Sequence, residues 1–276
     1  MIAILVLAVA EEKAAAEKDG HSPQSWMRYL HVCGTWRNLL QNKSSIWNEI
    51  RATNEDVTQY MLNPRRAQKP AIKACFYGYG EATCEGILRV LKGESSRIRA
   101  LDLAMPMEMW LSLCHGNPKL WMFDQLESLV VTMPTFWYTH ATIPFMVPKL
   151  QELRTNGFDL SAIQPLIGPS LKTLVIRDEE PTRKSDVLAA LRAAPHLENL
   201  TLNVRFWSGI DDSRNPPSVE LPCLRYVRVY IESEEHIELL PLLRYPDTAS
   251  TTFELDCTRY WEESTLVSDV GHIANE

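Results

Sequence analysis

The sequence lacks the motifs that mark common enzyme active sites. It has only 11 glycines in 276 residues, and its closest approach to a phosphate-binding loop, residues 77–86 (YGYGEATCEG), has no Lys-Ser/Thr pair. No Gly-x-Ser-x-Gly motif occurs. His31 and Cys33 lie two positions apart in a predicted helix, where their side chains do not face each other. We therefore expect a protein that is not an enzyme and needs no cofactor.

Closely spaced cysteines are also missing. The six cysteines are scattered, with none closer together than Cys75 and Cys84, so neither a zinc knuckle nor a dense disulfide scaffold is indicated. Residues 234–238 (EEHIE) have metal-binding residue types, but acids in the first turn of a helix favour the helix dipole without any metal. We expect no metal site, and reduced thiols in a cytoplasmic or nuclear protein.

Neither an excess of positive charge nor a long hydrophobic run is present. The chain has 28 Lys and Arg against 35 Asp and Glu, a net charge of −7, which disfavours a nucleic-acid partner. The apolar start, residues 1–10 (MIAILVLAVA), is about half of what a membrane span requires and has no basic residue before it. We therefore expect no membrane partner. The apolar share of 45% instead predicts a globular protein with a substantial core.

A repeated phrase predicts the architecture. Six segments share the pattern x-x-L-x-x-L-x-L with conservative substitutions, and their first apolar anchors are spaced by 21 to 28 residues, within the roughly 20–29 residues of a leucine-rich repeat. A proline stands two residues before four of the anchors, where it suits the turn into a strand. Weaker matches follow Pro70 and Pro246 and bring the expected strands to eight. The anchors are Ile98, Leu126, Leu150, Leu171, Leu197 and Leu224.

Between these strands the pattern changes to a helical period, so each repeat pairs a strand with a helix. The alternative is an ordinary doubly wound α/β sheet, which does not normally repeat one strand phrase with a fixed proline. The helical faces are predicted at Cys84, Ile87, Leu88 and Leu91, at Val187, Leu188 and Leu191 behind a Ser185 cap, and at Ile237, Leu240 and Leu243.

In each strand the residues between the anchors point to the opposite face of the sheet. On this face we expect a stripe rich in Arg and Tyr, the residue types enriched in binding hot spots. One hypothesis is that the stripe binds an acidic or phosphorylated segment of a partner protein. The alternative is that these are ordinary solvated side chains. The candidate partner-binding residues are Arg154, Asn156, Arg177, Asn203, Tyr226, Arg228 and Tyr230.

The segment before the repeats resembles the second half of the F-box of fungal F-box proteins that carry irregular leucine-rich repeats. Residues 25–50 (SWMRYLHVCGTWRNLLQNKSSIWNEI) match the phrase Val-Cys-x-x-Trp-Arg followed by a later Trp. The family's opening Leu-Pro phrase has no counterpart, so the resemblance is to a partial, N-terminally truncated F-box. The candidate residues for adaptor binding or for the core of this segment are Leu30, Val32, Cys33, Trp36, Leu39 and Trp47.

The resemblance implies a substrate receptor of an SCF-type ubiquitin ligase, whose F-box docks a Skp-type adaptor and cullin complex while the repeats bind an unknown substrate protein. The alternative is an interaction-only repeat scaffold that has lost adaptor binding. The implied fold class is α/β, a leucine-rich-repeat-like solenoid with a small all-helical F-box-like head. The expected divisions are a partial head at 1–50, a linker helix at 51–69, the solenoid at 70–260 and an acidic tail at 261–276.

Overall fold

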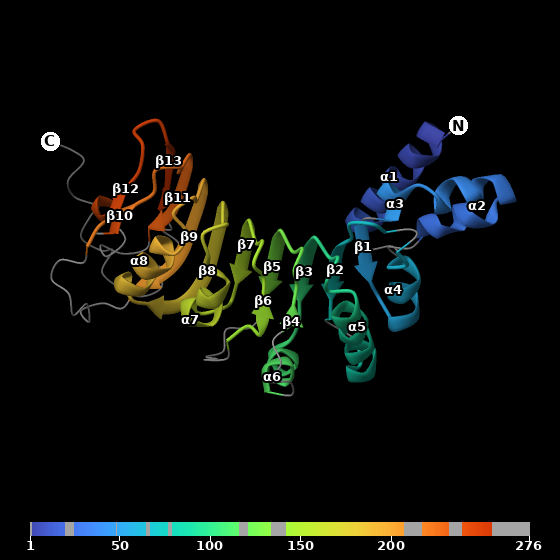
Figure 1. Ribbon diagram of the computed structural model, residues 1–276, viewed down its shortest axis with the longest axis horizontal. Coiled ribbons are helices and arrows are strands. Elements are labelled where there is room, and N and C mark those ends of the chain that lie inside the picture. Colours follow the sequence, from blue (N-terminus) through green and yellow to red (C-terminus); the bar gives the residue numbers. More distant parts are fainter. Residues whose placement is uncertain are drawn as a thin grey trace, which may run out of the picture.

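The structure is a computed structural model that describes residues 2–19, 25–47, 49–64, 67–76, 79–115, 121–133, 142–206, 217–231 and 239–255. It is a mixed α/β structure built on a nine-stranded parallel sheet, in which the strands follow one another in chain order. The sheet bends into an arc (Figure 1). Its strands are β1 (Glu49–Ala52), β2 (Ala71–Cys75), β3 (Ala100–Ala104), β5 (Ser128–Thr132), β7 (Glu152–Asn156), β8 (Thr173–Thr182), β9 (Asn199–Phe206), β11 (Tyr226–Ile231) and β13 (Ser250–Leu255).

Helices and short strands connect successive strands along the outer side of the arc (Figure 1). The helical elements are α5 (Glu81–Gly93), α6 (Met107–His115), α7 (Leu160–Ile163), η2 (Gln164–Leu166), α8 (Lys184–Arg192) and η3 (Leu240–Leu242). Two small parallel sheets pair β4 (Trp121–Met122) with β6 (Phe145–Met146) and β10 (Val219–Glu220) with β12 (Leu243–Arg244).

The core lies between the sheet and these outer elements. All six predicted anchors are buried, with at most 3% of any anchor exposed, which confirms their assignment. The apolar residues that follow them stack in register from strand to strand, as Leu153, Leu174 and Leu200 do across β7, β8 and β9. On α5 the predicted face is also largely correct, because Cys84 and Leu91 are buried. Because alternate residues of a strand point to the same face, these apolar side chains form a continuous layer under the sheet.

One turn of the arc requires glycine. Gly157, directly after β7, has a φ of +79°, a conformation that L side chains rarely adopt. A Cβ atom there would also lie 2.8 Å from the carbonyl oxygen of Met133. The turn between β7 and α7 therefore requires glycine at position 157.

The part before β2 differs from the predicted division. The elements from 2 to 47 are helical: α1 (Ile2–Asp19), η1 (Ser25–His31), α2 (Gly34–Gln41) and α3 (Ser44–Trp47). The predicted helical head, however, ends before residue 50, because β1 already begins at Glu49 and pairs with β2. The expected linker helix at 51–69 is only α4 (Glu55–Met61), which Asn54 caps by accepting a hydrogen bond from the Val57 amide at 2.8 Å.

Two expectations for the later helices were wrong. The N-cap of α8 is Arg183, and the Ser185 hydroxyl instead contacts the carboxylate of Asp186. Leu243 was expected on a helical face but belongs to β12, directly after η3. Residues 232–238, which include the predicted Glu-rich helix start, and residues 256–276, which include the predicted acidic tail, lie outside the described residues.

Candidate partner-binding surface

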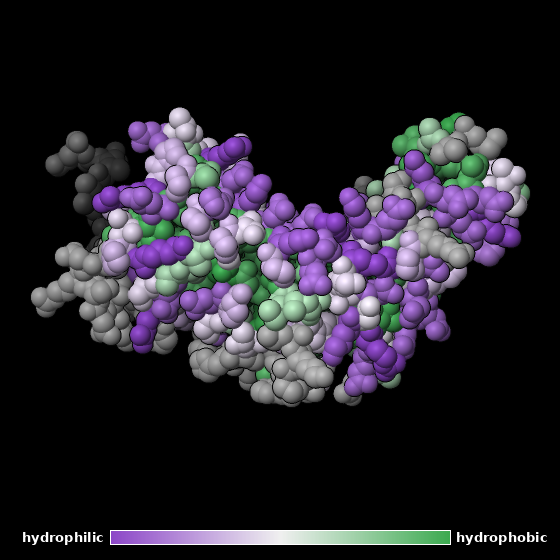
Figure 2. Space-filling model, in the orientation of Figure 1, coloured by the Kyte–Doolittle hydropathy of each residue, from purple (hydrophilic) through white to green (hydrophobic). Residues whose placement is uncertain are grey.

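The face of the sheet opposite the outer helices carries three rows of side chains, which together form what we term the open face. The first row runs across the strands through Ala71, Ala100, Ser128, Glu152, Thr173, Asn199, Tyr226 and Ser250. The second runs through Lys73, Asp102, Val130, Arg154, Val175, Thr201, Arg228 and Thr252. The third includes Asn156, Arg177 and Asn203. Figure 2 shows mostly hydrophilic surface along the inner side of the arc.

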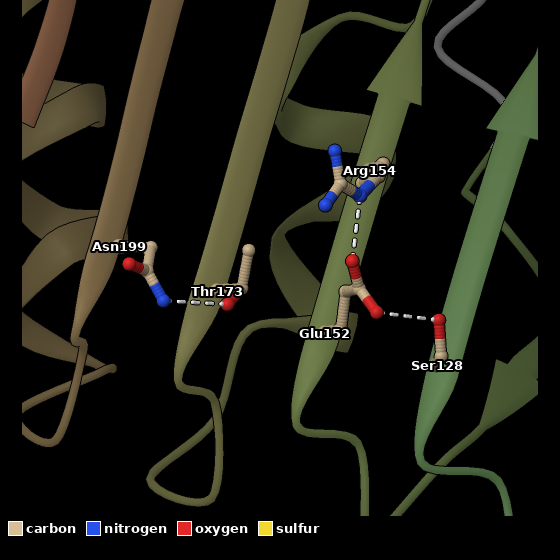
Figure 3. Close-up of polar contacts among 5 residues, drawn as sticks. All are labelled: Ser128, Glu152, Arg154, Thr173 and Asn199. Atoms are coloured by element: carbon tan, nitrogen blue, oxygen red, sulfur yellow. Dashed lines mark hydrogen bonds and ion pairs between the residues drawn. The ribbon is translucent and has the colours of Figure 1, made fainter. Parts of the chain in front are cut away.

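Side chains of neighbouring strands bond to one another across the first two rows (Figure 3). The Ser128 hydroxyl donates to one oxygen of Glu152 at 2.9 Å, and the Arg154 Nε donates to the other at 2.6 Å. The amide of Asn199 donates to the Thr173 hydroxyl at 3.1 Å. Glu152 therefore bridges two strands and holds the guanidinium of Arg154.

The arginines predicted for partner binding differ in their pairing. Arg154 pairs with Glu152, and the Nε of Arg228 lies 3.2 Å from a carboxylate oxygen of Glu254 on β13. Arg177 is exposed and forms no ion pair with the other described residues. Exposed pairs of this kind contribute at most about 1 kcal/mol, so a partner's acid can compete for either arginine. A partner's acid could pair with Arg177 without first displacing a carboxylate of the described chain.

A hollow of about 420 Å³ lies on the C-terminal half of the open face. Three predicted residues line it, namely Arg154, Tyr226 and Arg228, and Tyr226 is 61% exposed. Arg177 lies on β8 two residues after Val175, which lines the hollow, and belongs to the third row. Asn156 and Asn203 flank it in register on β7 and β9, and Tyr230 faces Glu254 across β11 and β13.

The six candidate residues of the helical segment divide between core and surface. Leu30 and Trp47 are buried, and the indole N–H of Trp47 donates to the carbonyl oxygen of Leu40 at 2.8 Å. Trp36 and Leu39 are half-buried. The remaining two are exposed: Val32, at 57%, and Cys33, whose sulfur caps α2 by accepting from the Trp36 amide.

An exposed apolar surface on α1 was not predicted. Leu5 and Val9 face the core, whereas Ile4 and Leu7 are 72% and 59% exposed. Figure 2 shows hydrophobic surface near the N-terminal end of α1. The signal was present in the sequence, because a helix that is apolar on every side and packs on one side must expose apolar residues on the other.

No family model, characterised protein or solved structure matched the chain in the three comparisons. Among the described residues no helix combines the length and apolar character needed to cross a membrane. The same residues contain no group of three or more His, Cys, Asp or Glu side chains placed to hold a metal ion. The function is therefore inferred from the open face and from the exposed apolar surface of α1.

Proposed function

We propose that this chain is a non-catalytic protein-interaction protein, the substrate receptor of an SCF-type ubiquitin ligase. In this proposal the helical residues before β1 form an F-box-like head that docks a Skp-type adaptor and, through it, a cullin. The strands and outer helices form a leucine-rich-repeat-like solenoid whose open face binds a substrate protein. The observation that carries the proposal is the open face itself, a sheet surface with aligned rows of mostly polar side chains on the side opposite the helices that connect the strands (Figure 1).

Two features of the fold support the solenoid. The strands lie in the sheet in chain order without a reversal, and the helices that connect them lie on one side of the sheet (Figure 1). A doubly wound sheet would reverse its strand order and place helices on both faces. Stacked repeats, in contrast, leave an extended inner surface for partners.

Exposed apolar side chains support the docking role of the helical segment. Ile4, Leu7 and Val32 are more than half exposed, which is uncommon for large apolar residues in such number on one short segment. A protein partner would remove them from water at roughly 25 cal/mol per Å² of apolar surface. Leu30 and Trp47 hold this surface in place from the core.

Co-purification with a Skp-type adaptor tests the receptor proposal. We expect the wild-type chain, co-expressed with the adaptor, to form a stable complex, and Leu7→Asp with Val32→Asp to abolish it. Met146→Asp is the control, because Met146 is also exposed but lies on β6, outside the helical segment. If no complex forms although the chain is folded, the interaction-only scaffold is the better description.

The open face is tested with acidic peptides. A peptide array of acidic and phosphoserine-containing segments should yield binders whose affinity falls about tenfold in Arg177→Ala, because a charge-assisted bond to an arginine is lost. Arg154→Ala should cost less, since its guanidinium is already held by Glu152. Arg89→Ala on α5 is the matched control for Arg154→Ala, because Arg89 is an exposed arginine on the outer side that pairs with Glu55. Equal losses in Arg89→Ala and Arg177→Ala would point to unspecific charge attraction.

A further inference from the structure

A cavity of about 340 Å³ lies where the helical segment meets the first strands of the open face. Its floor consists of residues from β1, β2, β3 and β5, and Lys13 of α1 and Trp26 of η1 line it from the other side. The cavity has room above the sheet because the first row has small side chains here, Ala71 and Ala100. On the later strands the same row has the larger side chains of Glu152 and Tyr226. The volume falls within the range of pockets that hold small ligands, roughly 300–1,000 Å³.

The lining contains a buried hydrogen-bond donor without an acceptor. Trp26 is fully buried, and its indole N–H has no hydrogen-bond partner among the described residues. Buried polar groups in native structures are nearly always satisfied, since an unpaired one carries a desolvation cost. Met61, Leu101 and Val130 provide apolar surface around the same space. The cavity therefore offers an apolar environment beside the buried Trp26.

Lys13 supplies a positive charge at this site. Its ammonium donates to the carbonyl oxygens of Ile46 at 2.6 Å and Glu49 at 3.2 Å, which uses two of its three hydrogens. The ammonium also lies 5.5 Å from the centre of the Trp26 ring. Burial lowers the pKa of Lys13, because the charged form loses hydration, and the nearby carboxylate of Glu49 only partly offsets this effect. A bound anion would compensate the charge and accept the third hydrogen.

Cationic side chains outnumber acidic ones in the lining of the cavity. Three cationic side chains line it, against two acidic ones, and one acid, Asp102, already lies 3.9 Å from the ammonium of Lys73. The lining is completed by Glu49 on the acidic side and by Lys13 and Arg51 on the basic side.

We propose that this cavity binds an organic carboxylate with an apolar body, its acid group at Lys13 and its apolar part against Trp26 and Val130. A free small acid and the C-terminal residue of a partner peptide offer the same chemistry. The site shares the first strands of the open face with the receptor function proposed above. None of its residues belongs to the exposed apolar surface of the helical segment or to the Arg154 hollow, so the two proposals are tested separately.

Binding of hydrocinnamate to the full chain, measured by saturation-transfer NMR and calorimetry, tests the proposal. We expect hydrocinnamate to bind and its neutral analogue hydrocinnamamide to bind at least about tenfold more weakly, since a hydrogen bond to a charged group is lost. Lys13→Met should weaken the acid by a similar factor. Ala100→Leu should block it by filling the floor, whereas Ala104→Leu, on the same strand and face but outside the cavity, should not.

A second arm identifies the source of the carboxylate. The peptide acetyl-Gly-Gly-Phe is compared in its free-acid and C-terminally amidated forms against hydrocinnamate. Tighter binding of the free-acid peptide supports a partner's C-terminus, and tighter binding of hydrocinnamate supports a small acid. Failure of both acids to bind at millimolar concentration, or equal binding of acids and amides, overturns the proposal. Thermal melting of each variant checks its folding, and Lys13→Met remains the deciding variant if Ala100→Leu does not fold.

Discussion

Replacing Trp47 with alanine should destabilise the chain by about 3–5 kcal/mol, the usual cost of removing a fully buried aromatic side chain. Trp47 is fully buried, its ring meets the edge of Trp26 at a centroid distance of 5.1 Å, and its N–H donates to Leu40. Alanine would leave a cavity among these side chains and remove the hydrogen bond to the Leu40 carbonyl oxygen. Urea denaturation followed by circular dichroism measures the loss.

Trp36→Ala is the matched control for this prediction. Trp36 resembles Trp47 in the sequence phrase but is only half-buried, and its ring lies 6.2 Å from that of Tyr29. We expect a smaller cost of about 1–2 kcal/mol. Equal losses in the two variants would show that both tryptophans belong to one core, contrary to their different exposure.

Much of the sheet could be predicted because its signal is local and repeated. Each anchor and the alternation after it occur within eight residues, four of the six anchors also have a proline before them, and the repetition of the phrase makes a chance match improbable. β1 was missed because it is only four residues long and two of them, Glu49 and Arg51, are charged. Its pairing with β2 is a tertiary contact, which a local pattern does not contain.

The ion pairs of the open-face arginines also show which contacts a local sequence pattern contains and which it does not. Glu152 and Arg154 are two residues apart on one strand, so their contact on one face could have been predicted from the period of a strand. The contact of Arg228 with Glu254 depends on the register between β11 and β13, which only the folded chain defines. The cavity at Lys13 required both the small residues of the first row and the position of α1.

Residues of the core should report whether the arc behaves as a stack of repeats. Leu174 is fully buried between Leu153 and Leu200, its partners in register on β7 and β9. Leu174→Ala should therefore cost about 2–5 kcal/mol. Val175→Ala, the next residue on the same strand but on the open face, should cost less than about 1 kcal/mol. Both values follow from urea denaturation.

Which strands lose stability in Leu174→Ala is more informative than the total loss in free energy of unfolding. In a stack of repeats each unit contacts only its neighbours, so stability is a sum of local terms. Hydrogen exchange in Leu174→Ala should then lose most protection in β7, β8 and β9, while β2 and β3 keep theirs. If protection falls equally along the whole sheet, the nine strands unfold as a single cooperative unit. The solenoid interpretation would then have to be given up in favour of one continuous α/β core, although the open face would keep the same side chains.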